Sequence, residues 1–428
     1  MLSIIIGLIL LMLLAYLGWS IIWIAPLVSG VVALLSGMNI LDSYTGTYME
    51  GFVGFAKDYF PIFLFGAVFG KLMEDTGAAQ SVAYKITNLI GKKRAILGML
   101  LSTAILTYGG VSLFVAVFAV YPIAVAMFRE ANVSRKLLPT TFVLGAFTFT
   151  MTALPGTPQI QNIIPINTFQ TGPFAAPILG LVAGIIMAVG GYFYLTFRQS
   201  RLDKQGDQFT EPEGDNQVKE INEDELPNWI LSIIPLVVVV VTLNLFDMSI
   251  LISLLIGILL IMLFNISDYK QFIGAINGGA SGSVMATINT SAAVGFGSVV
   301  TASPGFTSVK EMIFNIPLSP YFSEAFAVSL LAMITGSASG GMGIALEALG
   351  QQYYNIAIEQ GLSLEAFHRI TAVASGASIL PHNGALLTLF TVMGLTHKDS
   401  YKDVFVVGLL IPIVATIAII LLAMLGIN

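Results

Sequence analysis

A short polar run interrupts a long apolar stretch near the end of the chain, at a place where a membrane helix ought to continue. Pro381, His382, Asn383 and Gly384 follow one another inside the stretch 376–388. Proline removes a backbone donor and glycine loosens a helix, so the run predicts a helix break. In lipid, a break leaves N–H and C=O groups that must be paired by protein, water or a ligand. The run therefore predicts a binding site at membrane depth.

Three further interruptions are of the same kind. Residues 154–158 carry two prolines and a glycine, and 107–112 and 335–341 are rich in Gly, Ser and Thr. We expect all four to meet near the bilayer midplane, where half-helix N-termini favour an anion. The candidate substrate-binding residues are Tyr108, Gly109, Gly110, Ser112, Gly156, Thr157, Gln159, Asn162, Ser337, Ser339, Gly340, Gly341, Ser378, His382 and Asn383. Close helix packing is the alternative explanation of the glycine-rich runs.

These candidates are neutral hydrogen-bonding groups, which suit a small hydroxylated anion. We expect no buried arginine among them, and Arg369 is placed near a helix end. His382 and Glu347 are the candidates for carrying a coupling proton, because ionisable residues inside spans are functional hypotheses by default. A neutral structural histidine and a helix-end carboxylate are the corresponding alternatives.

The composition predicts an all-α polytopic membrane protein. Of 428 residues, 56% are hydrophobic and 10% are charged, whereas soluble domains carry about 25% charged residues. The absence of cysteine excludes disulfides and thiolate metal sites, and no phosphate-binding loop or HExxH motif occurs. We predict no enzyme activity, no cofactor or metal, and no nucleic-acid partner.

An acidic segment divides the chain into two halves. Residues 200–226 hold nine acidic and three basic side chains, which accounts for the whole net charge of −6. We predict a first repeat at 1–199, an acidic cytoplasmic linker at 200–227 with the composition of a disordered segment, and a second repeat at 228–428. The interruptions recur in the same order in both halves, as expected for an internal duplication.

The basic residues predict that the two repeats are inverted. The loops around 85–94 and 129–136 are basic, while their second-half counterparts near 313–322 and 356–365 contain no Lys or Arg. Because basic loops mark the cytoplasm, equivalent loops face opposite sides. Each half then has five crossings, one re-entrant hairpin and one broken helix. The protein is expected in the inner (plasma) membrane, with the linker in the cytoplasm and both termini outside.

The chain resembles the gluconate permease family of organic-anion:proton symporters, within the ion-transporter superfamily. The resemblance rests on Phe65-Gly66-Ala67, Gly70-Lys71-Leu72, 75–80 (DTGAAQ), Gly336-Ser337-Ala338, and Ser375–Ser378 with His382-Asn383. The family's first break contains histidine, whereas 154–159 here reads LPGTPQ, and Gly384 replaces an aspartate. The resemblance implies an elevator mechanism and a homodimer.

The predicted function is a secondary active transporter that imports a small organic hydroxy-acid anion, gluconate-like or a short hydroxycarboxylate, with protons. A Na⁺-coupled carboxylate transporter of the same architecture is the alternative. A channel and an intramembrane hydrolase are less favoured. A hydrolase would need a nucleophile and a base, and the pair Ser378 and His382 has no evident third partner.

Overall fold

The computed structural model describes residues 1–212, 222–314 and 317–428, and within these ranges the chain forms helices, turns and loops without a strand. The α-helices are α1 (Leu2–Tyr16), α2 (Ile21–Leu35), α3 (Ile40–Asp42), α4 (Met49–Asp75), α5 (Ala78–Ile90), α6 (Ala95–Tyr108), α7 (Leu113–Glu130), α8 (Leu138–Phe142), α9 (Ile160–Phe169), α10 (Pro177–Lys204), α11 (Trp229–Asn244), α12 (Ile250–Phe264), α13 (Tyr269–Ala302), α14 (Phe306–Phe314), α15 (Pro320–Thr335), α16 (Ala338–Ala345), α17 (Gln351–Gln360), α18 (Leu364–Ser375), α19 (Gly384–Met393), α20 (His397–Phe405) and α21 (Ile411–Met424).

The apolar helices confirm a polytopic membrane protein. Helical stretches long and apolar enough to cross a bilayer run over Ile40–Asp75, Pro177–Lys204, Tyr269–Ala302 and His397–Met424. Shorter apolar helices lie around them, including α1, α2, α11 and α12. The count of five crossings in each half stays a prediction.

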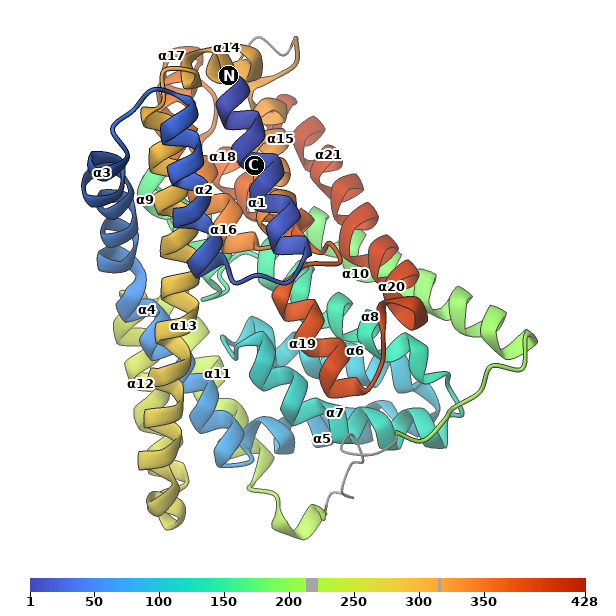
Figure 1. The fold of residues 1–428 in the computed structure, drawn as a ribbon. Coiled ribbons are helices and arrows are strands. Elements are labelled where there is room, and N and C mark those ends of the chain that lie inside the picture. The colour runs from blue at the N-terminus through green and yellow to red at the C-terminus, as the bar shows by residue number, and fades with distance from the viewer. Residues whose placement is uncertain (213–221, 315–316) are drawn as a thin grey trace.

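One group of helices is built around the two longest ones. Helices α4 and α13 run side by side, flanked by α2 and α12, with α1 beside α2 and α11 beside α12 (Figure 1). Small residues permit the two helices to approach closely. At Gly279 of α13 there is no room for a larger residue, because an added Cβ would lie only 2.7 Å from the Cα of Val68 on α4. We call α1, α2, α4, α11, α12 and α13 the α4–α13 group.

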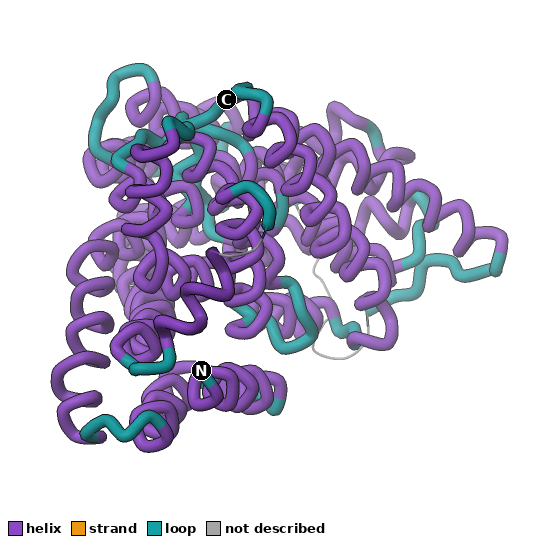
Figure 2. The backbone as a smooth tube through the Cα atoms, turned by 90° about the horizontal axis from the view of Figure 1, so that it is seen from above, coloured by secondary structure: helices purple, strands orange, loops and turns teal. Residues whose placement is uncertain are grey.

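The second group contains the four predicted interruptions. It consists of α6 to α10 from the first half and α15 to α21 from the second, which pack across each other (Figure 1). Seen from above, the described chain consists of helices joined by loops (Figure 2). In each half a pair of helices joined by a short turn, α6–α7 and α15–α16, precedes an interrupted helix. This common order agrees with a duplication, while the inverted orientation and the re-entrant character of the pairs stay predictions.

Both helix breaks lie where the sequence predicts them. After the π-helical segment Phe149–Ala153, residues 154–159 leave the helix before α9 begins. Gly156 adopts φ of 78°, which lies in the left-handed region that glycine tolerates best. In the second half, α18 ends in the 3-10 turn Gly376–Ser378, and residues 379–383 separate it from α19. Local proline and glycine content is thus sufficient to set both positions.

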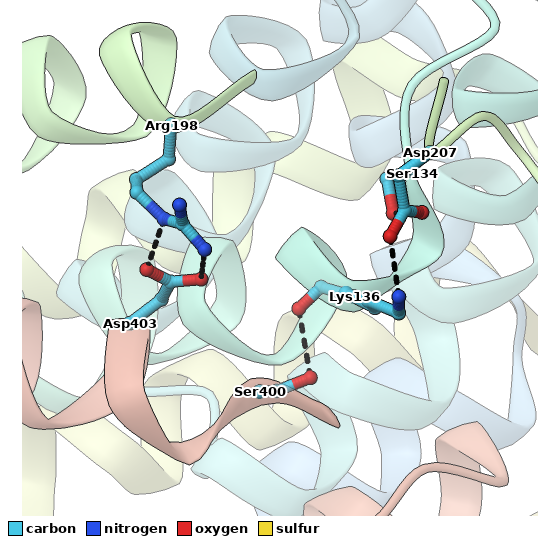
Figure 3. Close-up of polar contacts among 6 residues, drawn as sticks. All are labelled: Ser134, Lys136, Arg198, Asp207, Ser400 and Asp403. Atoms are coloured by element: carbon cyan, nitrogen blue, oxygen red, sulfur yellow. Dashed lines mark hydrogen bonds and ion pairs between the residues drawn. The ribbon is translucent and has the colours of Figure 1, made fainter. Parts of the chain in front are cut away.

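The first residues of the predicted acidic linker form the last part of helix α10. Helix α10 continues to Lys204, because its last turn carries charged side chains that suit water on several sides. After it, Asp207 pairs with Lys136 and accepts a 2.7 Å hydrogen bond from Ser134 (Figure 3). Glu211 binds Arg129 through both carboxylate oxygens. The linker residues Asp207 and Glu211 are therefore held against one of the basic loops, and residues 213–221 of the predicted linker lie outside the described residues.

A second polar contact joins helices on the same side. Arg198 of α10 donates hydrogen bonds of 2.5 and 3.1 Å to Asp403 of α20, and Ser400 donates to the Lys136 backbone oxygen at 2.7 Å (Figure 3). Both ends of the chain lie toward the other end of the molecule (Figure 1). Which end faces the cytoplasm stays a prediction.

The contact between linker and basic loop should weaken when Asp207 loses its charge. Burial disfavours ionisation of Asp207, but hydrogen bonds from Lys136 and Ser134 outweigh it and hold the pKa of Asp207 below its ordinary value. The contact is therefore complete above the ordinary pKa of about 3.9 and is lost as the pH falls through the lowered pKa. At neutral pH, Asp207→Asn should speed thiol labelling of a cysteine placed at Gln208 by up to about fivefold, since a partly exposed pair is worth about 0–1 kcal/mol.

Asp203→Asn is the matched control, because Asp203 is exposed on the last turn of α10. Equal labelling rates in the two variants would show that the Asp207 pair does not hold the linker.

Candidate functional site

The first turn, between α6 and α7, lies directly against the first break. The Tyr108 hydroxyl donates to the Pro155 oxygen at 3.0 Å, and the Thr157 hydroxyl donates to the Tyr108 oxygen at 3.3 Å. The Gln159 amide donates to the Thr107 oxygen at 2.7 Å. A Cβ on Gly110, whose φ is +99°, would lie 2.9 Å from Pro158. Turn and break thus pair backbone groups that each would otherwise leave unpaired.

The second turn, between α15 and α16, lies against the second break in an equivalent arrangement. The His382 Nε2 lies 3.3 Å from the Ile334 oxygen, and a Cβ on Gly336 would lie 2.6 Å from His382 Cδ2. Asn383 caps α19 by accepting from the Leu386 N–H at 2.9 Å while donating to the Ser378 oxygen at 3.1 Å. The candidates Ser378, His382 and Asn383 are therefore brought together at one place.

The two arrangements also touch each other. A Cβ on Gly376, at the start of the second break, would lie 3.5 Å from the Thr152 hydroxyl just before the first break. The guanidinium of Arg369, on α18, reaches across to the Ala153 oxygen at 3.3 Å. The interruptions are thus parts of one contiguous region.

Helices begin at each of the four interruptions. Helices α7, α9, α16 and α19 start at residues 113, 160, 338 and 384, directly after the two turns and the two breaks. Ser112 and Ser337 cap two of these helices by accepting from backbone N–H groups at 3.4 and 3.1 Å. Helix N-termini carry partial positive charge and orient N–H donors outward, so this region suits an anion.

Several candidate residues instead contact the α4–α13 group. Gly109 and Gly156 lie against Leu236 and Asn244 of α11, where an added Cβ would be 2.7 and 2.8 Å from these side chains. The Ser339 hydroxyl lies 3.3 Å from that of Thr290 on α13. Two further glycine candidates have different neighbours. Gly340 lies against Ala293 of α13, whereas Gly341 packs on the backbone of α15.

The structure overturns the prediction that no arginine is buried among the interruptions. Arg369 is fully buried in the middle of α18 rather than near a helix end. It donates to the Ala153 and Ala175 oxygens, at 3.3 and 2.8 Å, and to Asn162 Oδ1 at 2.8 Å. A weaker 3.4 Å contact reaches the Pro173 oxygen. Its charge is accommodated there because the first break and the loop between α9 and α10 leave carbonyl oxygens that need donors.

His368 is a second buried residue that sequence reasoning missed. Its Nδ1 lies 2.6 Å from the Thr171 hydroxyl and its Nε2 lies 3.3 Å from Asn162 Oδ1. Asn162 therefore links His368 and Arg369 of α18 to the first break. The signal in the sequence was the pair His368-Arg369, which precedes the polar run at Pro381 inside an otherwise apolar segment.

A cavity of about 690 Å³ opens beside this region. It lies between α4 and α13 on one side and α9 and α16 on the other, and its lining includes Glu50, Asp58 and Glu347. The Ser298 hydroxyl donates to Glu347 at 3.3 Å. A second, apolar cavity of about 360 Å³ is lined by Tyr108, Gly109 and residues of α11. Each cavity thus lies at the boundary between the two helix groups.

Comparison with known proteins places the chain among transporters. Residues 1–247 match the model of the GntP family permease. The chain is 40% identical to "Uncharacterized transporter YxjC" of Bacillus subtilis, over 94% of each chain. It is 27% identical to an "Uncharacterized transporter" of Haemophilus influenzae over 82% of each chain. It is also 30% identical to a "Gluconate permease" of Bacillus licheniformis, over 38% of this chain and 34% of the relative. The fold, the family match over more than half of the chain and the full-length relative agree: this protein is a membrane transporter of the GntP permease family, and not an enzyme.

Proposed function

We propose that the protein imports a small organic hydroxy-acid anion together with protons. One observation carries the proposal: four helices begin at interruptions that pack together beside Arg369, a buried cation. Within the described residues, Arg369 makes no salt bridge to a carboxylate. Helix N-termini and a buried guanidinium without an ion-pair partner among the described residues both favour a bound anion.

The substrate class follows from the donors that surround the interruptions. Hydroxyl and amide side chains dominate there, as in Ser337, Thr157 and Asn383. Such groups recognise the hydroxyls of a sugar acid or a short hydroxycarboxylate. The family resemblance and the gluconate permease of Bacillus licheniformis support a gluconate-like substrate. Some candidate residues, such as Gln159, already donate hydrogen bonds to backbone oxygens. In this proposal they hold the site in shape as well as contact the substrate.

An elevator movement fits the boundary between the two helix groups. Gly109, Gly156 and Gly340 place small surfaces against α11 and α13. Small contact residues let helices approach closely and slide with little loss of packing. In this proposal the interruptions and their bound anion move against the α4–α13 group, the two halves form inverted repeats with re-entrant hairpins, and two copies associate.

Coupled protons would offset the cost of bringing an anion into a negatively charged interior, about 2.3 kcal/mol per charge per 100 mV. His382 and Glu347 are the sequence candidates for this role. Glu347 faces the larger cavity and His382 lies at the second turn. The positive-inside pattern supports a location in the inner membrane with the linker on the cytoplasmic side and both termini outside.

Uptake by the purified protein in liposomes tests the proposal. We expect saturable accumulation of radiolabelled D-gluconate or glycerate when the lumen is made alkaline, and collapse of the accumulation by a protonophore. Protein-free liposomes are the control. Accumulation driven by a Na⁺ gradient alone would replace proton coupling with the sodium alternative. Equilibration without accumulation or saturation would indicate a channel.

A further inference from the structure

Glu324 of α15 is a fully buried acid that the proposed site does not use. The Thr371 hydroxyl, on α18, donates to Glu324 Oε1 at 2.5 Å. The other carboxyl oxygen, Oε2, is buried without a hydrogen-bond partner. The carboxyl group of Glu324 thus has one hydrogen bond in the contact between α15 and α18.

The groups around Glu324 provide no compensating positive charge. Tyr321 and Tyr353 are its titratable neighbours, from α15 and α17. The Tyr321 hydroxyl accepts from the Ser363 N–H at 2.9 Å, and the Tyr353 hydroxyl donates to Ser323 at 3.3 Å. On α18, the cation Arg369 is bonded to the first break instead. Among the described residues, no lysine, arginine or histidine forms a salt bridge with Glu324.

An ionised carboxylate in this position would be strongly disfavoured. One hydroxyl cannot replace the water that an ionised carboxylate loses on burial, and an unpaired oxygen adds to the cost. A protonated carboxylic acid is neutral and needs few partners. The burial and the contacts of Glu324 therefore indicate that it holds a proton in this conformation.

We propose that Glu324 is the residue that carries the coupled proton during transport. This inference rests on the proposed proton symport. The carboxylate would take one proton from water on one side and return it to water on the other, so only the O–H bond forms and breaks. Glu324 suits the role better than Glu347, which is exposed and lines a cavity, so that its side chain is not enclosed in this same conformation.

The position of Glu324 links its protonation to the four interruptions, which we call the substrate region because the anion is proposed to bind there. Helix α15 leads directly into the second turn at Thr335 and Gly336. Helix α18 carries Arg369 and leads into the second break. Separation of α15 and α18 would let water reach Glu324, and the same separation would shift the second turn against the second break. Ionisation would therefore favour a conformation in which the substrate region is rearranged.

Glu324→Gln tests the assignment, because glutamine has the shape of the protonated acid. We expect the variant to fold with wild-type thermal stability and to keep exchange of radiolabelled gluconate or glycerate across liposomes. Accumulation driven by a gradient of about one pH unit, worth about tenfold per coupled proton, should be lost. Glu359→Gln, on the exposed face of α17, removes the same charge and should accumulate normally.

Infrared difference spectroscopy of the purified full chain provides a readout that needs no substrate. The wild type and Glu359→Gln should show a buried carboxylic acid C=O band that Glu324→Gln lacks. Absence of this difference, or wild-type proton-driven accumulation by Glu324→Gln, would overturn the assignment of Glu324 alone. A third outcome is that the wild type shows the band and yet takes up substrate at a rate that does not depend on the pH gradient. That result would overturn proton symport and the transport role of Glu324, but not the protonated state of Glu324.

Discussion

Replacing Arg369 by glutamine is expected to remove both stability and anion binding. The substitution takes donors from the Ala153 and Ala175 oxygens and from Asn162, all in the buried surroundings of the first break. Because each buried group left unpaired costs about 1–3 kcal/mol, we expect a total loss of at least about 3 kcal/mol. The apparent melting temperature of the detergent-purified protein measures this loss.

The lysine variant separates the charge of Arg369 from its hydrogen bonds. Arg369→Lys keeps the positive charge but cannot reproduce the planar fork that bonds several oxygens at once. We expect it to melt at a lower temperature than the wild type and still to be stabilised by added gluconate or glycerate, whereas Arg369→Gln should lose this ligand-induced shift. Arg201→Gln, exposed on α10, is the control. If added ligand raises the melting temperature of Arg369→Gln as much as that of the wild type, the charge of Arg369 has no part in anion binding.

Gly336→Ala is expected to reduce transport about tenfold or more. Gly336 has φ of +61°, and its added Cβ would lie 2.6 Å from His382 Cδ2 and 3.4 Å from the Asn383 Cα. The left-handed conformation costs a non-glycine residue roughly 1–2 kcal/mol, and the contact must in addition displace the His382 ring. Since about 1.4 kcal/mol corresponds to a factor of ten, moving the second turn away from the break should weaken binding by at least that factor. Initial uptake rates in liposomes check this.

Gly361→Ala is a closely matched control for Gly336→Ala. Gly361 has φ of +64° and no atom within 4 Å of an added Cβ, so the substitution imposes the same backbone strain without a contact. The double variant Gly336→Ala/His382→Ala should transport no worse than His382→Ala alone, apart from the strain seen at Gly361. If Gly336→Ala and Gly361→Ala behave alike, the contact between turn and break is not required for transport.

The sequence alone determined where the helices are interrupted. Proline and glycine act on the backbone of their own neighbourhood, so residues 154–158 and 380–384 could be identified without knowing what surrounds them. Hydrophobic composition likewise determined that the chain is a polytopic membrane protein, because no soluble core needs so many apolar residues. The residues of the second break, Ser378 to Asn383, do lie together as expected.

Only the tertiary structure decided which charged residues are buried. Arg369 bonds oxygens about two hundred positions earlier in the chain, and Glu324 is enclosed by helices that follow it. The sequence shows the charge of these side chains. It does not show the carbonyl oxygens that surround the guanidinium of Arg369, nor the helix contact that encloses the carboxyl group of Glu324. The free energy of a buried charge depends on its partners in space, and those partners are fixed only when the two halves of the chain pack together.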